Sequence, residues 1–159
     1  MNRKQIVWIV FCLPLLFASC DSSVVSSAHQ DVDEQGWAMT DTVRLSLNVE
    51  DTTQTYDLAL MLRHTERYTY QNLWFFVQCA DSLSPVQRDT VMACLADDRG
   101  QWLGTRAGRY YNGYLFLQRG VTFPETGTYT FAIVHGMRDS LICGVADIGL
   151  ELRKNNGQE

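Results

Sequence analysis

The chain of 159 residues has little positive charge. It carries 13 lysine and arginine residues against 18 aspartate and glutamate residues, a formal net charge of -5. No basic stretch is longer than Arg3-Lys4 or Arg153-Lys154, so nothing could follow a phosphate backbone, and we expect no nucleic-acid partner. The hydrophobic content of 46% excludes a disordered chain and suffices for the core of one domain.

The motifs of common catalytic and metal sites are also missing. There is no nucleophile elbow of the GxSxG type, no CxxC pair and no Cys/His spacing that suits zinc. His135 stands close to Arg138 and Asp139, where a hydrogen-bonded turn network is the better interpretation. We therefore predict no enzyme, no catalytic residue and no cofactor.

No hydrophobic run is long enough for a permanent membrane span. Residues 6–17 are apolar with one proline inside, whereas a spanning helix needs about 20 residues. A short cationic start precedes this run, which is typical of a bacterial export signal. The sequence Phe17-Ala18-Ser19-Cys20 is similar to a lipobox. We expect a lipoprotein signal peptide at residues 1–19 and lipid, including palmitate, on Cys20; the alternative is an ordinary signal peptide with Cys20 incidental.

Residues 20–36 are rich in serine and acidic side chains and show no apolar period. This composition predicts a lipidated cysteine followed by a flexible tether, which would reach at most about 50 Å when extended. We place the folded domain at residues 37–154 and a short disordered tail at residues 155–159. The protein would then be attached to a membrane of the cell envelope.

From residue 37 onward, apolar residues recur with period two, and no window shows a convincing helical period. The pattern predicts an all-β antiparallel sandwich of seven to eight strands, either a jelly roll or immunoglobulin-like. Trp74 and Phe131 are expected in its core. A helix over residues 84–95 is the alternative for that segment. The expected strands are residues 43–49, 56–62, 73–77, 89–95, 113–119, 128–135, 140–143 and 145–153.

Three cysteines remain in the domain: Cys79, Cys94 and Cys143. An odd number cannot all pair, and each stands inside an expected strand, where cysteine usually behaves as a small buried hydrophobe. We expect buried free thiols, with a bridge between Cys79 and Cys94 as the alternative.

The pair Asp97-Asp98 precedes Arg99-Gly100, which predicts a β-turn. Such a loop with oxygen ligands could hold calcium, but the spacing is not diagnostic, so both residues are only weak metal candidates. Adjacent carboxylates on a turn usually point apart, which disfavours a pair that acts as general acid and general base.

Aromatic residues gather in the glycine-rich segment around Trp102, with Tyr110, Tyr111 and Tyr114 nearby. Exposed, they would form a platform for a sugar ring or a partner's side chains, so carbohydrate is a possible ligand. The alternative is that Trp102 packs inward at one end of the sandwich. Trp102, Tyr110, Tyr111 and Arg138 are the residues that we expect on an interaction surface.

The segments Gly-Gln-Trp-Leu-Gly at residues 100–104 and Gly-Met-Arg at residues 136–138 belong to a larger set of matching stretches. The others are residues 67–76, 89–90, 95–97, 127–131 and 141–150. In these stretches the domain resembles the gliding-motility lipoprotein family GldH of the Bacteroidetes. The resemblance implies an envelope lipoprotein whose partners are other envelope proteins of the gliding and type IX secretion machinery. It implies no catalytic residue.

Overall fold

The computed structural model describes residues 23–81, 84 and 88–155, and every regular element in this part of the chain is a β-strand. The expectation of an all-β fold is confirmed. The strands are β1 (Val24–Asp31), β2 (Trp37–Ala38), β3 (Val43–Val49), β4 (Tyr56–Thr65), β5 (Asn72–Cys79), β6 (Arg88–Cys94), β7 (Thr105–Ala107), β8 (Tyr110–Val121), β9 (Gly127–His135), β10 (Leu141–Ile142) and β11 (Val145–Lys154).

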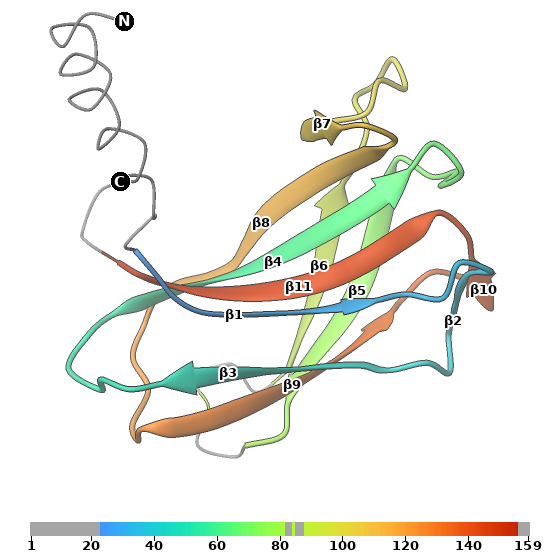
Figure 1. The fold of residues 1–159 in the computed structure, drawn as a ribbon. Helices are drawn as coiled ribbons and strands as arrows, with labels where there is room; N and C mark the ends of the chain where they lie inside the picture. Colours follow the sequence, from blue (N-terminus) through green and yellow to red (C-terminus); the bar gives the residue numbers. More distant parts are fainter. Residues whose placement is uncertain (1–22, 82–83, 85–87, 156–159) are drawn as a thin grey trace, which may run out of the picture.

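The strands form two facing antiparallel sheets (Figure 1). One sheet has the order β1-β11-β4-β8-β7, the other has the order β3-β9-β5-β6, and β10 and β2 form a small third sheet. The eight longest strands pair in a nested way: β1 with β11, β3 with β9, β4 with β8, and β5 with β6. This nesting is the jelly-roll arrangement, so the structure selects the jelly roll over the immunoglobulin-like alternative.

The core lies between the two large sheets. In β3 buried and exposed residues alternate without a break, as the sequence predicts for a strand with one solvated face. Phe131 in β9 and Phe75 in β5 are fully buried, which confirms the prediction for Phe131. Burying such a side chain contributes roughly 2 to 3 kcal/mol, so these inward rows supply the main driving force for the fold.

The predicted tether is wrong for residues 24–31, which form β1. This strand pairs with β11 along its length, from Val24 opposite Arg153 to Asp31 opposite Asp147. Ala28 packs against the core, and the Ser26 hydroxyl accepts a hydrogen bond of 2.9 Å from the backbone N–H of Asn48 in β3. The segment is polar because it is an edge strand, and its order comes from a partner strand more than 110 residues away in the sequence.

Some other expectations also need correction. Trp74 was expected in the core but lies on the outer face of β5, and β2 and β7 were not expected. The helical alternative is wrong for Arg88–Cys94, which form β6. Cys79, Cys94 and Cys143 are free thiols, so the bridge is not formed. Only Cys79 is buried; Cys94 is exposed because it follows the inward-facing Ala93 in β6.

The sandwich has two distinct ends (Figure 1). The backbone N–H of Lys154 donates to the carbonyl of Ser23 over 2.8 Å, so the described chain begins and stops at one end, which we call the near end. The links that follow β1, β4, β6 and β9 lie at the opposite end, the far end. Cys20 lies outside the described residues. Within the described ranges, no helix is long and apolar enough to cross a bilayer.

Candidate functional site

A cluster of four rings fills the far end of the sandwich. His64 from β4 meets the ring of Trp102 at 4.6 Å, edge to face, and stacks on Tyr111 from β8 at 5.4 Å. Tyr68 completes the cluster, with its ring 5.9 Å from His64. His64, Tyr68 and Tyr111 are buried and Trp102 is half-buried. The structure therefore supports the alternative in which Trp102 packs inward, and it does not show an open aromatic platform.

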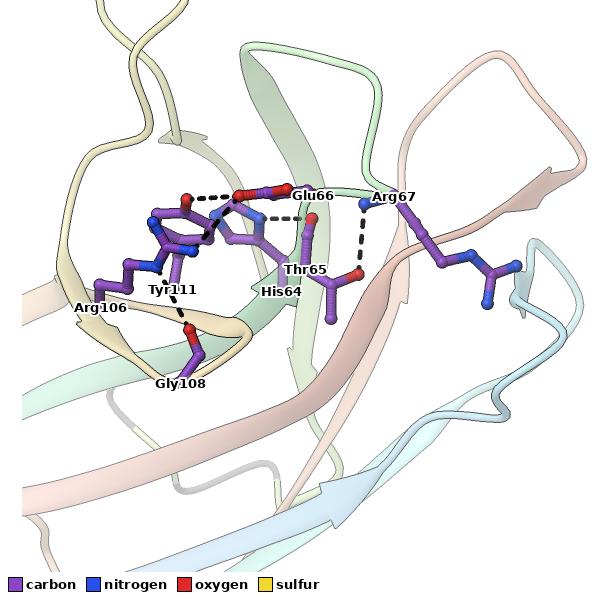
Figure 2. Close-up of polar contacts among 7 residues, drawn as sticks. All are labelled: His64, Thr65, Glu66, Arg67, Arg106, Gly108 and Tyr111. Atoms are coloured by element: carbon purple, nitrogen blue, oxygen red, sulfur yellow. Dashed lines mark hydrogen bonds and ion pairs between the residues drawn. The ribbon is translucent and has the colours of Figure 1, made fainter.

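Polar contacts hold two rings of this cluster, His64 and Tyr111, as Figure 2 shows. The Tyr111 hydroxyl donates to Glu66 Oε1 over 3.0 Å, and Arg106 Nη2 lies 3.6 Å from the same oxygen. His64 Nδ1 lies 3.2 Å from the carbonyl oxygen of Thr65, so this nitrogen carries the proton. Burial lowers the pKa of His64, which keeps the ring neutral. These groups are engaged with one another and serve the fold.

The two other tyrosines of the predicted platform lie apart from the cluster. The guanidinium groups of Arg63 and Arg109 lie over the Tyr110 ring, 5.0 and 4.9 Å from its centroid. Tyr114 is exposed and packs edge to face on Phe116 at 5.4 Å. The sequence thus identified residues of the far end, but the structure does not unite them in one flat surface.

The Asp97-Asp98 segment forms the predicted turn. Asp97 Oδ1 accepts hydrogen bonds from the backbone N–H groups of Arg99 and Gln101, at 2.9 and 2.8 Å. Gly100 donates to the Asp97 carbonyl and has a φ of 76°, which favours glycine. Among the described residues no group of three or more His, Cys, Asp or Glu side chains could hold a metal. The calcium alternative gains no support, because Asp97 is committed to its own turn.

An exposed apolar surface lies elsewhere, on the outer face of β5 and β6. Trp74, Phe76 and Met92 are 40%, 47% and 46% exposed. Trp74 and Met92 are direct cross-strand partners, so they stand side by side on this face. We call these three residues the outer β5 patch. Sequence reasoning missed it because an apolar run on both faces of a strand predicts burial on both faces.

Arg138 lies at the edge of the outer β5 patch. A hollow of about 440 Å³ beside Trp74 is lined by Tyr70, Met137, Arg138 and Asp139, among others. The backbone N–H of Trp74 donates to Met137 Sδ over 3.5 Å, which fixes the loop against the strand. Arg138 is exposed, as expected for a residue that faces a partner, but the structure joins it to Trp74 and not to Trp102.

His135 does not form the expected turn network with Arg138 and Asp139. It ends β9 with its ring inward, 1% exposed and packed edge to face on Trp37 at 5.4 Å. In the part of the chain that the structure describes, neither ring nitrogen has a hydrogen-bond partner. Burial lowers the pKa of His135, outweighing smaller opposite effects of the Trp37 backbone and Asp139. Asp139 instead accepts a hydrogen bond from the Tyr70 hydroxyl.

Two solved structures share a general likeness with this chain. The infectious bursal disease virus VP2 subviral particle matches 90% of this chain and 37% of its own, with 14% identity and a TM-score of 0.30. The Eiger TNF of S. frugiperda matches 86% of this chain and 99% of its own, with 13% identity and a TM-score of 0.29.

Two relatives are similar over nearly their whole length. The gliding motility lipoprotein GldH homolog of Christiangramia forsetii is 28% identical, and the alignment covers 98% of this chain and 99% of the relative. The gliding motility lipoprotein GldH of Flavobacterium johnsoniae is 24% identical over 93% of this chain and 96% of its own. The family model described as GldH lipoprotein matches residues 24–152. The chain belongs to the GldH lipoprotein family.

Proposed function

We propose that the chain is a non-catalytic, lipid-anchored interaction component of the gliding or type IX secretion machinery in the cell envelope. The observation that carries this proposal is the outer β5 patch of Trp74, Phe76 and Met92. The family supplies the biological setting, because both relatives are named gliding motility lipoproteins.

The composition of the patch suits a protein interface. Tryptophan and arginine are over-represented among residues that dominate binding energy, and here Trp74 stands next to Arg138. Contiguous exposed apolar side chains on a soluble domain usually mark an interaction surface. Trp74 and Phe76 point away from the core, so they are free to contact a partner without disturbing the sandwich.

The position of β1 limits how far an anchored domain could stand from the membrane. If Cys20 carries lipid, the first described strand begins four residues later, at Val24. A link of that length spans at most about 14 Å, so the near end would lie against the bilayer. β11 has 10 residues and therefore a length of about 33 Å, so a domain that stood upright would carry its far end about that far from the surface. The outer membrane or the periplasmic face of the envelope would suit this arrangement.

Complementation of a deletion strain of a gliding relative tests the proposal. We expect the unaltered chain to restore spreading, and Cys20→Ser or the double variant Trp74→Ala/Phe76→Ala to fail at normal protein levels. The matched control is Met39→Ala/Leu141→Ala, which removes apolar side chains that are 45% and 48% exposed elsewhere. Full spreading with Cys20→Ser would refute the anchor, and full spreading with the patch variant would refute the interface.

A further inference from the structure

A cleft of about 330 Å³ opens at the far end, where β1, β4 and β11 meet the turn between β7 and β8. It lies on the β1-β11-β4-β8 sheet, whereas the outer β5 patch lies on the other sheet, so the two are independent. Its charged lining consists of Asp31, Glu34, Arg63, Arg67, Arg109 and Asp147.

Two of the arginines make side-chain contacts beside the cleft. Arg63 Nε donates to Asp147 Oδ2, and the Asp147 side chain is only 12% exposed. Arg109 Nη2 donates to the Tyr110 hydroxyl over 2.6 Å, and both guanidinium groups lie over the Tyr110 ring. Each guanidinium keeps further N–H groups that these contacts do not use. These contacts restrict the two side chains before a ligand binds, which would reduce the entropy lost on binding.

The side chains of the remaining charged residues of the cleft form no hydrogen bond or close ion pair within the described residues. Within the described residues, the guanidinium of Arg67 makes no hydrogen bond or ion pair, and in Figure 2 it points away from the contacts of Glu66. Among the described residues the carboxylates of Asp31 and Glu34 likewise accept no hydrogen bond, although Glu34 interacts electrostatically with Arg109. Arg67, Asp31 and Glu34 therefore line the same space without a direct hydrogen bond between them.

This mixture of groups defines the chemistry of a ligand. A guanidinium binds a carboxylate through two parallel N–H bonds, whereas a carboxylate accepts hydrogen bonds from donors such as hydroxyl groups. A peptide of glutamate residues has no side-chain hydroxyl to donate to Asp31 and Glu34, and its carboxylates would be repelled by them. A neutral sugar would leave the arginines without an anion. A uronic acid offers a carboxylate and several hydroxyl groups on one ring.

We propose that this cleft binds an acidic saccharide, with the uronate carboxylate on Arg67 and Arg109 and the sugar hydroxyls on Asp31 and Glu34. The volume lies at the small end of ligand pockets, which span about 300 to 1,000 Å³, and suits one or two sugar rings. The cleft opens at the end farthest from the start of β1, so an anchored chain would present it away from the membrane.

Calorimetry on the lipidated mature chain in detergent tests this assignment. We expect trigalacturonate to bind, with neutral galactotriose and triglutamate at least about tenfold weaker, and binding to weaken as salt is raised. Arg67→Gln and Arg109→Gln should each weaken trigalacturonate by about tenfold. Arg99→Gln, an exposed arginine outside the cleft, is the matched control and should change nothing.

The double variant Asp31→Asn/Glu34→Gln separates a sugar site from a simple anion site. Loss of the carboxylates should weaken trigalacturonate, because the hydroxyl groups lose their strongest acceptors. Tighter binding of that variant, equal binding of triglutamate, or no heat with trigalacturonate at millimolar concentration would overturn the proposal. Thermal melts of each variant show that it is folded. None of these outcomes bears on the outer β5 patch, which the complementation experiment tests.

Discussion

A histidine ring that is buried without a hydrogen-bond partner makes stability depend on pH. Burial lowers the pKa of His135, so in acid the unfolded chain takes up a proton that the folded chain does not. The free energy of unfolding should therefore fall as the pH drops below about 6.5, the ordinary histidine value, until the folded pKa is reached. His64 adds to the effect in the same direction.

We predict that His135→Phe reduces the loss of thermal stability between pH 7.5 and pH 5, since phenylalanine packs on Trp37 and takes up no proton. Near neutral pH the variant should be about as stable as the unaltered chain, because no hydrogen bond is removed. Melting curves followed by circular dichroism at both pH values measure this. The same loss in both proteins would show that His135 plays no part in the acid response.

Variants of Phe131 and Trp74 test which side chains lie in the core and which lie on the surface. Phe131 is fully buried, so Phe131→Ala should lower the free energy of unfolding by about 3 to 5 kcal/mol. Trp74 is 40% exposed, so Trp74→Ala should cost only about 1 kcal/mol or less. Urea denaturation of the two variants measures the difference, and equal losses would contradict the orientation of β5.

For single residues, the sequence showed which side chains deserve notice better than it predicted which other side chains surround them in the fold. It singled out Trp102, Tyr111 and Arg138, but which of them share a surface depends on contacts between strands that are distant in the sequence. Trp74 was misplaced because its exposure depends on whether anything covers the outer face of the sheet. The residues of a strand do not show whether another element covers the outer face of its sheet.

Among the elements, β1 is the one whose order depends most on a distant partner. It pairs with β11, and the Ser26 hydroxyl and the Gln30 side-chain oxygen accept hydrogen bonds from backbone N–H groups of β3. Without β1, one side of β11 would have unpaired backbone groups, and Leu150 and Leu152 would lose cover. β1 therefore belongs to the fold, although its composition is that of a linker.

We predict that a chain that starts at Trp37 melts at least about 10 °C below a chain that starts at Asp21, or fails to fold. Both lack the lipidated cysteine, so the comparison isolates the segment that contains β1. Differential scanning calorimetry measures the two transitions. Equal melting temperatures would mean that residues 24–31 are a tether after all.

The strands that the sequence predicted well are those with one clear period. Residues 43–49 match β3 without error, and residues 145–153 match β11 to within one residue. The sequence did not predict the short strands β2 and β7, because two or three residues are too few to show an alternating period. The sequence did not predict β1, because two of its inward-facing side chains, Ser26 and Ala28, are small where a strand usually has branched residues.

For the whole molecule, the jelly roll separates in space the surfaces that the two proposals use. The near end would lie against the membrane, while the far end carries the ring cluster and the arginine-lined cleft. The outer β5 patch runs along one side of the sandwich. A partner could therefore bind the side of an anchored domain while a saccharide occupies its far end. The order of strands in the sheets, which creates these positions, could not be read from strand periods alone.

Site-specific photocrosslinking in gliding cells tests the central claim most directly. A photoreactive residue at Thr90 would sit opposite Phe76 within the outer β5 patch, and one at Gln118 would sit on the outer face of the other sheet. We predict crosslinks from Thr90 to a component of the gliding or type IX secretion machinery, lost in the Trp74→Ala/Phe76→Ala background, and none from Gln118. No such crosslink from Thr90, or equal crosslinks from both positions, would contradict the account.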